Sequence, residues 1–279
     1  MTDVVIIGGG PGGYEAALVA SQLGGTVTLV ERTGLGGAAV LTDVVPSKTL
    51  IATAEVMTKI ERAGELGLSF AGGSVPAASV TVDMAAVNRR VLALARAQSQ
   101  DIEARLTTEG VRIVRGSARL ESIATVLAAT ADGDVRLNAD IILIATGTTP
   151  RELPAAKPDG ERIFTWTQVY NLTELPERLI VVGSGVTGAE FASAYNALGV
   201  DVALVSSRHQ VLPGLDDDAG RVVQEVFERS GMAILSQSRA ESVRREGDQV
   251  VVTLAGGRQL AGSHCLLAVG SVPNTSGRM

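Results

Sequence analysis

The stretch that decides the fold is DVVIIGGGPGGYEAALVASQLGGTVTLVERTG, which runs from Asp3 to Gly34. It opens with the apolar, β-branched run Asp3 to Ile7, which is typical of a strand that is buried on both faces. Glycines follow, then alanines and leucines at helical spacing, and then a second apolar run from Thr26 to Val30. This order predicts a strand–helix–strand unit of about thirty residues.

The turn between the first predicted strand and the helix carries the pattern Gly8-x-Gly10-x-x-Gly13, with Pro11 inside it. In a dinucleotide-binding turn the first glycine permits the sharp bend, the second lets the backbone approach a pyrophosphate, and the third lets helix and strand pack closely. The helix N-terminus offers free N–H groups to the phosphates. Glu31 ends the second predicted strand, where a carboxylate accepts hydrogen bonds from an adenosine ribose. The motif predicts a bound dinucleotide; the alternative is a tight turn without a ligand.

A second stretch, RLIVVGSGVTGAEFASAYNALGVDVALVSS from Arg178 to Ser207, repeats the order of strand, glycine turn, helix and strand. The same glycine spacing predicts a second nucleotide site. The residues of this second turn are Gly183, Gly185, Val186, Thr187 and Gly188. The tandem repeat predicts an α/β fold of two doubly wound, Rossmann-like dinucleotide-binding domains, each of the three-layer ββα type.

The two predicted sites differ at the end of their second strand. The second site has Ser206, Ser207 and Arg208 there and no acid. Without a carboxylate, nothing repels a 2′-phosphate, and these three residues are candidates to bind it. The second site is therefore expected to take NAD(P)H, with a preference for NADPH that does not exclude NADH. For Arg208 the alternative is a solvated loop charge.

The pattern along the whole chain predicts one domain over residues 1–150 and a second over residues 151–273. Residues 274–279 are expected to begin the return of the chain to the first domain. A length of 279 residues suits about two domains. Helices are expected over 46–64, 83–109 and 216–230, short antiparallel strands over 111–120, 124–130 and 134–139, a strand over 141–145, and a linker over 151–162.

Composition and charge exclude several classes of function. The net charge is −6, and the basic residues are scattered among acids, which argues against a nucleic-acid partner. The single cysteine, Cys265, lies in the apolar run HCLLAVG and is expected to be buried, and His209 and His264 have no metal-ligand spacing. No apolar run approaches the ~18 residues of a membrane span, and the first is too short for a signal peptide. We expect a soluble, cytoplasmic protein without a bound metal or a membrane span.

Three further motifs join the two glycine turns to make a set of five motifs. They are GLGGAAVLTDVVPSK (34–48), ILIATG (142–147) and AVGSVPN (268–274). With the two glycine turns, they resemble the class I pyridine nucleotide-disulfide oxidoreductases, FAD-dependent flavoproteins that include lipoamide dehydrogenase and the glutathione and mercuric reductases. In that family the first motif reads G-G-x-C-x-x-x-x-C-x-P-S-K, and its cysteines form a disulfide beside the flavin. Here Ala39 and Val44 hold the two cysteine positions, and Asp43 replaces a glycine.

This departure removes the disulfide chemistry. Thiol exchange needs a thiolate and a second sulfur, and Cys265 lies in the other predicted domain. The segments GGAAVL, VPSK, GSGVTGAEF and GSVPNTSG resemble those of actinobacterial NAD(P)H:quinone reductases of this family. This resemblance implies hydride transfer from NAD(P)H to FAD and electron transfer to a quinone-type acceptor. A pyridine nucleotide transhydrogenase and a non-catalytic dinucleotide-binding fragment are the alternatives.

The resemblance also implies site residues. Lys48 and Glu190 match a family pair beside the isoalloxazine, where a lysine near flavin N5 would stabilise negative charge and the glutamate would orient it. The alternatives are a helix-surface lysine and a glutamate in a first helical turn. Further cofactor contacts are implied for Arg32, Gly36, Gly37, Ala38, Ala118, Thr146, Gly147 and Gly270.

Members of the family continue beyond the position of Met279. The resemblance implies that they return to the flavin domain and then form homodimers through a C-terminal domain. We therefore expect this chain to be a truncated copy that lacks the dimer domain. Part of the sheet and core of the first domain is then expected to be exposed.

Overall fold

The computed structural model describes residues 1–68 and 80–275 of the chain. Contacts within it divide the chain into two units. The first unit contains Met1–Pro46, Leu92–Thr149 and Ser271–Met279, and the second contains Ser47–Val91 and Pro150–Gly270. The described residues of the segment 47–91, which was predicted as part of the first domain, group with the second unit. One tie is a buried hydrogen bond from Asn88 Nδ2 to the Leu172 carbonyl, at 2.7 Å.

The first unit is built on a parallel four-stranded sheet in the order β3-β2-β1-β7. Its strands are β1 (Asp3–Ile7), β2 (Thr26–Glu31), β3 (Arg112–Arg115) and β7 (Ile141–Ile144). Helix α1 (Pro11–Gln22) connects β1 to β2, as the opening stretch predicted. At the edge strand β7, the side chains of Ile141 and Ile144 are 53% and 45% exposed.

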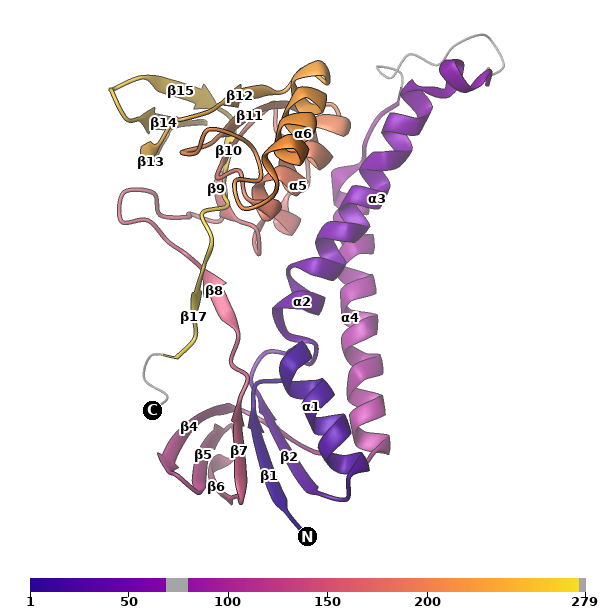
Figure 1. Cartoon of the computed structure of the whole chain (residues 1–279), viewed down its shortest axis with the longest axis vertical. Coiled ribbons are helices and arrows are strands. Elements are labelled where there is room, and N and C mark those ends of the chain that lie inside the picture. The colour runs from indigo at the N-terminus through magenta and orange to yellow at the C-terminus, as the bar shows by residue number, and fades with distance from the viewer. Residues whose placement is uncertain (69–79, 276–279) are drawn as a thin grey trace. The chain divides into compact units, whose positions relative to one another are not determined.

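Alternation along β1 produces the three layers of this unit. Val4 and Ile6 belong to a core with Ala17 of α1 on one face of the sheet. Val5 and Ile7 belong to a second core on the other face, because successive side chains of a strand point to opposite faces. The second core is completed by an antiparallel sheet of β4 (Ser117–Ser122), β5 (Thr125–Thr130) and β6 (Gly133–Asn138). Figure 1 shows α1 and this small sheet on either side of β1 and β2.

The prediction for residues 111–120 was wrong in one respect. It treated them as one antiparallel strand, whereas β3 joins the parallel sheet beside β2 and only β4 is antiparallel. The break falls at Gly116, where an added Cβ would lie 2.3 Å from the Ala129 carbonyl oxygen. A single glycine thus separates two strands of different sheets.

The predicted helices are present with small shifts of their ends. They are α3 (Val44–Glu61), followed by the 3-10 helix η1 (Ala63–Leu66), α4 (Met84–Thr108) and α6 (Asp217–Arg229); a short helix α2 (Gly37–Leu41) was not predicted. Along α4, Met84 and Leu106 are buried. Leu94 is 43% exposed, because its neighbour Ala95 takes the buried position on that turn.

The second unit repeats the design with a parallel sheet in the order β12-β11-β10-β16-β9. Its elements are β9 (Ile163–Thr165), the 3-10 helix η3 (Val169–Asn171), β10 (Arg178–Val182), α5 (Val186–Ala197), β11 (Asp201–Val205), β12 (Ala233–Leu235), β13 (Ala240–Glu246), β14 (Gln249–Leu254), β15 (Gln259–Gly262) and β16 (His264–Leu267). Ile180 and Cys265 pack against Val252 of the antiparallel sheet β13-β14-β15. Cys265 is fully buried, which confirms its expected place in the core.

A short two-stranded ribbon pairs β8 (Thr148–Pro150) with β17 (Ser271–Pro273). It brings the ILIATG and AVGSVPN motifs together, although they are far apart in the sequence. Within the described residues, no helix combines the length and the apolar character that a membrane crossing requires.

Candidate functional site: two dinucleotide cradles and an ion pair

The first glycine turn has the geometry that its three glycines predict. Gly8 has φ +106°, and a Cβ there would lie 2.3 Å from the Ala145 carbonyl oxygen. A Cβ on Gly13 would lie 1.8 Å from the Gly8 oxygen. A Cβ on Gly10 would meet nothing closer than 3.9 Å. The outer two glycines are therefore required by packing, whereas Gly10 leaves open the space that a pyrophosphate would approach.

The segment that resembles the flavin-facing motif packs against this turn. The Gly36 amide donates to the Gly9 carbonyl at 2.8 Å. A Cβ on Gly37 would lie 2.8 Å from the Gly10 Cα. Gly36 itself has φ +89°, a left-handed conformation that favours glycine. The first unit therefore brings the predicted contacts Gly10, Gly36 and Gly37 together, with Pro11 and Ala38 exposed beside them.

Glu31 is buried and fixed by four hydrogen bonds. Its Oε2 accepts from the Gly9 amide at 2.7 Å, and its Oε1 accepts from the Thr33 amide at 2.6 Å, the Thr33 hydroxyl at 2.8 Å and the Gly34 amide at 3.2 Å. Burial alone would raise the pKa of this carboxyl, but the hydrogen bonds outweigh it and the pKa is lowered. Each carboxylate oxygen has about two lone pairs, so Oε2 retains acceptor capacity for a ribose hydroxyl.

The second glycine turn has the same geometry. A Cβ on Gly183, which has φ +110°, would lie 2.1 Å from the Ala268 carbonyl oxygen, and one on Gly188 would lie 1.8 Å from the Gly183 oxygen. A Cβ on Gly185 would meet nothing within 4 Å. Helix α5 begins at Val186 without a side-chain cap, so its first N–H groups remain available for a phosphate.

The end of β11 differs from the end of β2 in its chemistry. Ser206 is buried, and its hydroxyl lies 2.7 Å from the Ser184 hydroxyl and accepts from the Arg208 amide at 3.1 Å. Ser206 and Ser184 hold the places in the repeat that Glu31 and Gly9 hold in the first unit. The Ser206 hydroxyl is therefore engaged within the protein, whereas Ser207 and Arg208 are exposed.

Lys48 and Glu190 form an ion pair within the second unit. The Lys48 Nζ lies 2.6 Å from Oε1 and 2.8 Å from Oε2 of Glu190, so the contact is bidentate. Lys48 comes from α3 and Glu190 from α5, and their side chains are 52% and 26% exposed. The sequence offered the resemblance alone as a reason to pair these residues. The geometry joins them, in a position where the ammonium remains accessible.

The positions that hold cysteines in the family carry no reactive group here. Ala39 is half-buried, and the Val44 side chain is 46% exposed. Backbone amides of Thr42 and Asp43 donate to the Ala38 carbonyl at 3.0 and 2.8 Å, which closes the turn between the two positions. Burial raises the pKa of the Cys265 thiol, so this thiol is unreactive as well.

The ribbon reveals a residue that sequence reasoning missed. The Asn274 Nδ2 donates to the Thr146 carbonyl at 3.0 Å, the Thr146 hydroxyl donates to the Asn274 carbonyl at 2.8 Å, and the Asn274 amide donates to the Gly147 carbonyl at 2.9 Å. Asn274 thus fixes the backbone of two predicted cofactor contacts. Its place at the end of SVPN was the available signal.

Three predicted contacts remain. Arg32 is exposed, and Ala118, a residue of β4, is buried in the core. Gly270 has φ +88° with open space beside it, and its carbonyl accepts from the Arg151 amide at 2.9 Å. The described residues contain no group of three or more histidine, cysteine or acidic side chains that could hold a metal ion.

Comparison with known proteins identifies the family. The family model described as pyridine nucleotide-disulphide oxidoreductase matches residues 2–278. This chain belongs to the pyridine nucleotide-disulphide oxidoreductase family. The doubly wound α/β fold expected from the tandem glycine turns is confirmed.

Several members of the family are similar over nearly the whole chain. An NAD(P)H dehydrogenase (quinone) of Mycobacterium tuberculosis is 47% identical over 99% of this chain and 57% of its own length. A dihydrolipoyl dehydrogenase of Zymomonas mobilis is 33% identical over 98% of this chain and 58% of its own length. The crystal structure of LpdA from Mycobacterium tuberculosis superposes with a TM-score of 0.92 at 46% identity, over all of this chain and 60% of that one. The chain thus spans somewhat more than half the length of the relatives it matches.

Proposed function

We propose that this chain acts as the dinucleotide-binding part of an NAD(P)H oxidoreductase that carries FAD in the first unit and NAD(P)H in the second. Electrons would pass to a quinone-type acceptor without a redox-active disulfide. The observation that carries the proposal lies between residues 34 and 48. Gly36 and Gly37 pack on the first glycine turn, while Ala39 and Val44 provide no thiol. The name of the Mycobacterium tuberculosis relative, NAD(P)H dehydrogenase (quinone), supports the same acceptor class.

FAD, when bound, would supply the redox chemistry by accepting hydride from NAD(P)H and releasing electrons to the quinone. The open faces at Gly10 and Gly185 fit the two pyrophosphates, since a Cβ at either position would occupy that space. Glu31 would accept a ribose hydroxyl of FAD at Oε2. The role of Lys48 rests on the resemblance to the family alone, in which the matching lysine, held here by Glu190, would stabilise negative charge on the flavin.

The preference for NADPH is part of the proposal. Arg208 is exposed, and its backbone amide is fixed by the Ser206 hydroxyl. We assign the 2′-phosphate contact to Ser207 and Arg208, and a positioning role to Ser206, since its hydroxyl is buried. The first unit provides a comparison, because a carboxylate at this place would repel a 2′-phosphate. There a carboxylate, Glu31, occupies the equivalent place, and Gly9 makes room for it, because a Cβ on Gly9 would lie 3.2 Å from the Glu31 Cγ.

The Gly9 and Glu31 pair of the first unit provides a test of the NADPH preference. The double substitution Ser184→Gly with Ser206→Glu copies the first unit's pair into the second. It should shift the ratio of NADPH to NADH dissociation constants by tenfold or more toward NADH, which corresponds to about 1.4 kcal/mol. Single Ser206→Ala serves as the matched control, because it removes the positioning hydroxyl without adding charge. An unchanged ratio in the double variant would remove the end of β11 from nucleotide selection.

Two other functions remain as alternatives to the main proposal. A pyridine nucleotide transhydrogenase also needs no dithiol, and a dinucleotide-binding fragment without catalysis needs no acceptor. We propose that the longer members of the family form homodimers, as the resemblance implies. We also propose that this protein is located in the cytoplasm.

The function is tested by a visible spectrum and a two-acceptor assay. Purified chain should carry or take up FAD, with the absorption bands of a bound flavin. Oxidation of NADPH and NADH should then proceed with menadione and fail with a disulfide substrate. Lys48→Met should slow flavin reduction while FAD stays bound, and Glu190→Gln should act in the same direction. Failure to bind flavin would end the proposal for this chain, and turnover of the disulfide alone would contradict the role given to Ala39 and Val44.

A further inference from the structure

A cavity lies at the end of the second unit's parallel sheet that is opposite the glycine turn. Its volume is about 610 Å³, which is within the range of ligand sites of roughly 300–1,000 Å³. Glu177 precedes β10, and His264 begins β16, so the cavity is at the amino ends of the strands. Gly183 follows the carboxyl end of β10. One five-residue strand, about 16 Å at ~3.3 Å per residue, therefore separates the cavity from the proposed nucleotide turn.

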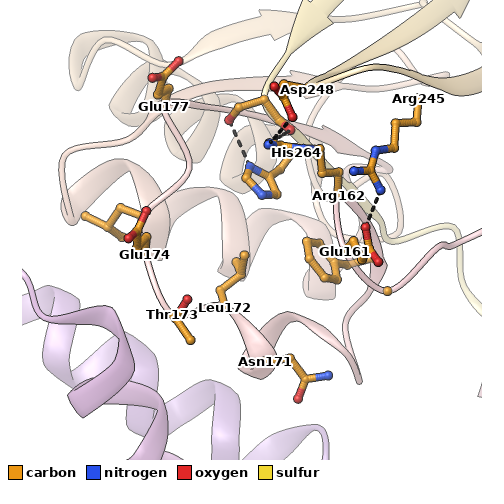
Figure 2. Close-up of a pocket in the computed structure, with 14 residues that line it drawn as sticks. Glu161, Arg162, Asn171, Leu172, Thr173, Glu174, Glu177, Arg245, Asp248 and His264 are labelled. Carbon is orange, nitrogen blue, oxygen red and sulfur yellow. Dashed lines mark hydrogen bonds and ion pairs between the residues drawn. The ribbon is translucent and has the colours of Figure 1, made fainter.

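The cationic side chains of this cavity are already paired (Figure 2). The Arg162 guanidinium donates to the Asp248 carboxylate and to the Ser263 carbonyl, both at 3.2 Å. The Arg245 guanidinium donates to Glu161 and lies 3.7 Å from Asp159. Each arginine is therefore paired with at least one carboxylate.

The opposite wall presents acceptors that have no partner. Figure 2 shows Glu174 and Glu177 on the loop that follows η3, across from the arginine pairs. Within the described residues, neither carboxylate makes a hydrogen bond or an ion pair. The walls carry four carboxylates against two guanidinium groups, so the cavity has an excess of negative charge.

His264 adds a third acceptor, and its tautomer follows from its neighbour. The Ser263 hydroxyl donates its one proton to the Arg178 carbonyl at 3.0 Å. The contact of 3.0 Å between Ser263 Oγ and His264 Nδ1 therefore needs the proton on Nδ1. Burial lowers the pKa of His264 to about 4, so the ring is neutral at pH 7. Nε2 is then an unprotonated acceptor on the ring that lines the cavity. The ring stacks on Phe164, with centroids 5.9 Å apart and planes at 12°, which holds it in place.

The unpaired charged groups of this cavity are thus the carboxylates of Glu174 and Glu177, beside the neutral side chains of Asn171 and Thr173. The ligand that these carboxylates fit is a donor-rich cation. We propose that the cavity is a ligand site for an organic cation with a guanidinium group, distinct from the proposed nucleotide site. A guanidinium presents five N–H donors in one plane and binds carboxylates in a bidentate manner. A metal ion fits less well, because the described residues hold no suitable group of three histidine, cysteine or acidic ligands. This inference does not depend on the proposed redox function.

Titration with agmatine, which carries a guanidinium and an amine, tests the site without any activity assay. Calorimetry on the 279-residue chain at low salt should show saturable binding at one site. Glu174→Gln with Glu177→Gln should weaken it on the order of five- to tenfold, as expected for the loss of two exposed charge pairs. Glu225→Gln with Glu228→Gln on α6 changes the net charge equally and should leave binding within about twofold. Tetramethylammonium, a cation without N–H donors, should not compete.

The two histidines provide a second measurement. The chain contains only His209 and His264. Nitrogen chemical shifts should change at the His264 Nε2 on addition of agmatine and stay constant at His209, which lies outside the cavity lining. Absence of saturable binding, equal binding of tetramethylammonium, or an unaffected Glu174/Glu177 double variant would each overturn the proposal.

Discussion

Replacing Glu31 by glutamine tests how the first cradle is held together. Glutamine has nearly the same shape, so no cavity forms. It retains one oxygen, however, and places an NH₂ group where the second carboxylate oxygen was. If the oxygen stays with Thr33 and Gly34, the NH₂ group faces the buried Gly9 amide, which then has no acceptor.

The cost follows from these contacts. A buried donor left without a partner costs about 1–3 kcal/mol, and each charge-assisted hydrogen bond that becomes neutral loses roughly half its strength. We therefore expect Glu31→Gln to lower the free energy of unfolding of the first unit by about 2–4 kcal/mol at pH 7. Thr33→Val removes only the 2.8 Å hydroxyl bond and serves as a graded control, at about 0.5–1.5 kcal/mol.

The assay can separate the two units. The single tryptophan, Trp166, is buried in the second unit, so its fluorescence reports unfolding there. Urea unfolding followed by far-UV circular dichroism reports both units. Glu31→Gln should shift the dichroism transition to lower urea and leave the Trp166 transition in place. A loss below about 1 kcal/mol at pH 7 would refute the role assigned to these hydrogen bonds.

The pH dependence of the stability provides an independent test of whether ionised Glu31 stabilises the first unit. The pKa of Glu31 is lowered in the folded state, so its ionised form contributes stability at pH values above the unfolded pKa of about 4.3. This contribution is lost as pH falls through the folded pKa. Glutamine does not titrate, so the difference between wild type and Glu31→Gln should narrow below about pH 4.3. A difference that widens in acid would contradict the direction of the shift.

Two further outcomes follow from positions in the second unit. Gly185→Ala should leave the melting temperature unchanged and weaken NAD(P)H binding by tenfold or more in a fluorescence titration. Gly188→Ala should fold poorly, because its Cβ would lie 1.8 Å from the Gly183 oxygen. Equal losses of stability in the two variants would show that Gly185 serves packing alone. Cys265 should react with a thiol reagent only after denaturation, since burial raises its pKa; rapid reaction of the native chain would mean that β16 opens readily.

Local pattern was sufficient to predict the cradles, because strand burial, glycine spacing and helix start all lie within thirty or so residues. It was insufficient where a residue's partner is distant in sequence. Nothing local indicates that Asn274 fixes Thr146, which lies 128 residues before it. The sequence also did not predict that the chain passes from one sheet to another at Gly116. The residues on both sides of Gly116 alternate between apolar and polar in the same way, and only the strands with which they pair differ.

The Lys48–Glu190 ion pair also bears on how the chain is synthesised. Its partners are 142 residues apart, so α3 leaves the ribosome well before α5 exists. At about 5–20 residues per second, that interval lasts roughly 7–30 s. During this time Leu50 and Ala54, which are buried in the finished unit, have no completed second unit to pack against. Nascent chains of this protein should therefore need protection of α3 by a chaperone, and slowing translation between α3 and α5 should lower the yield of folded protein.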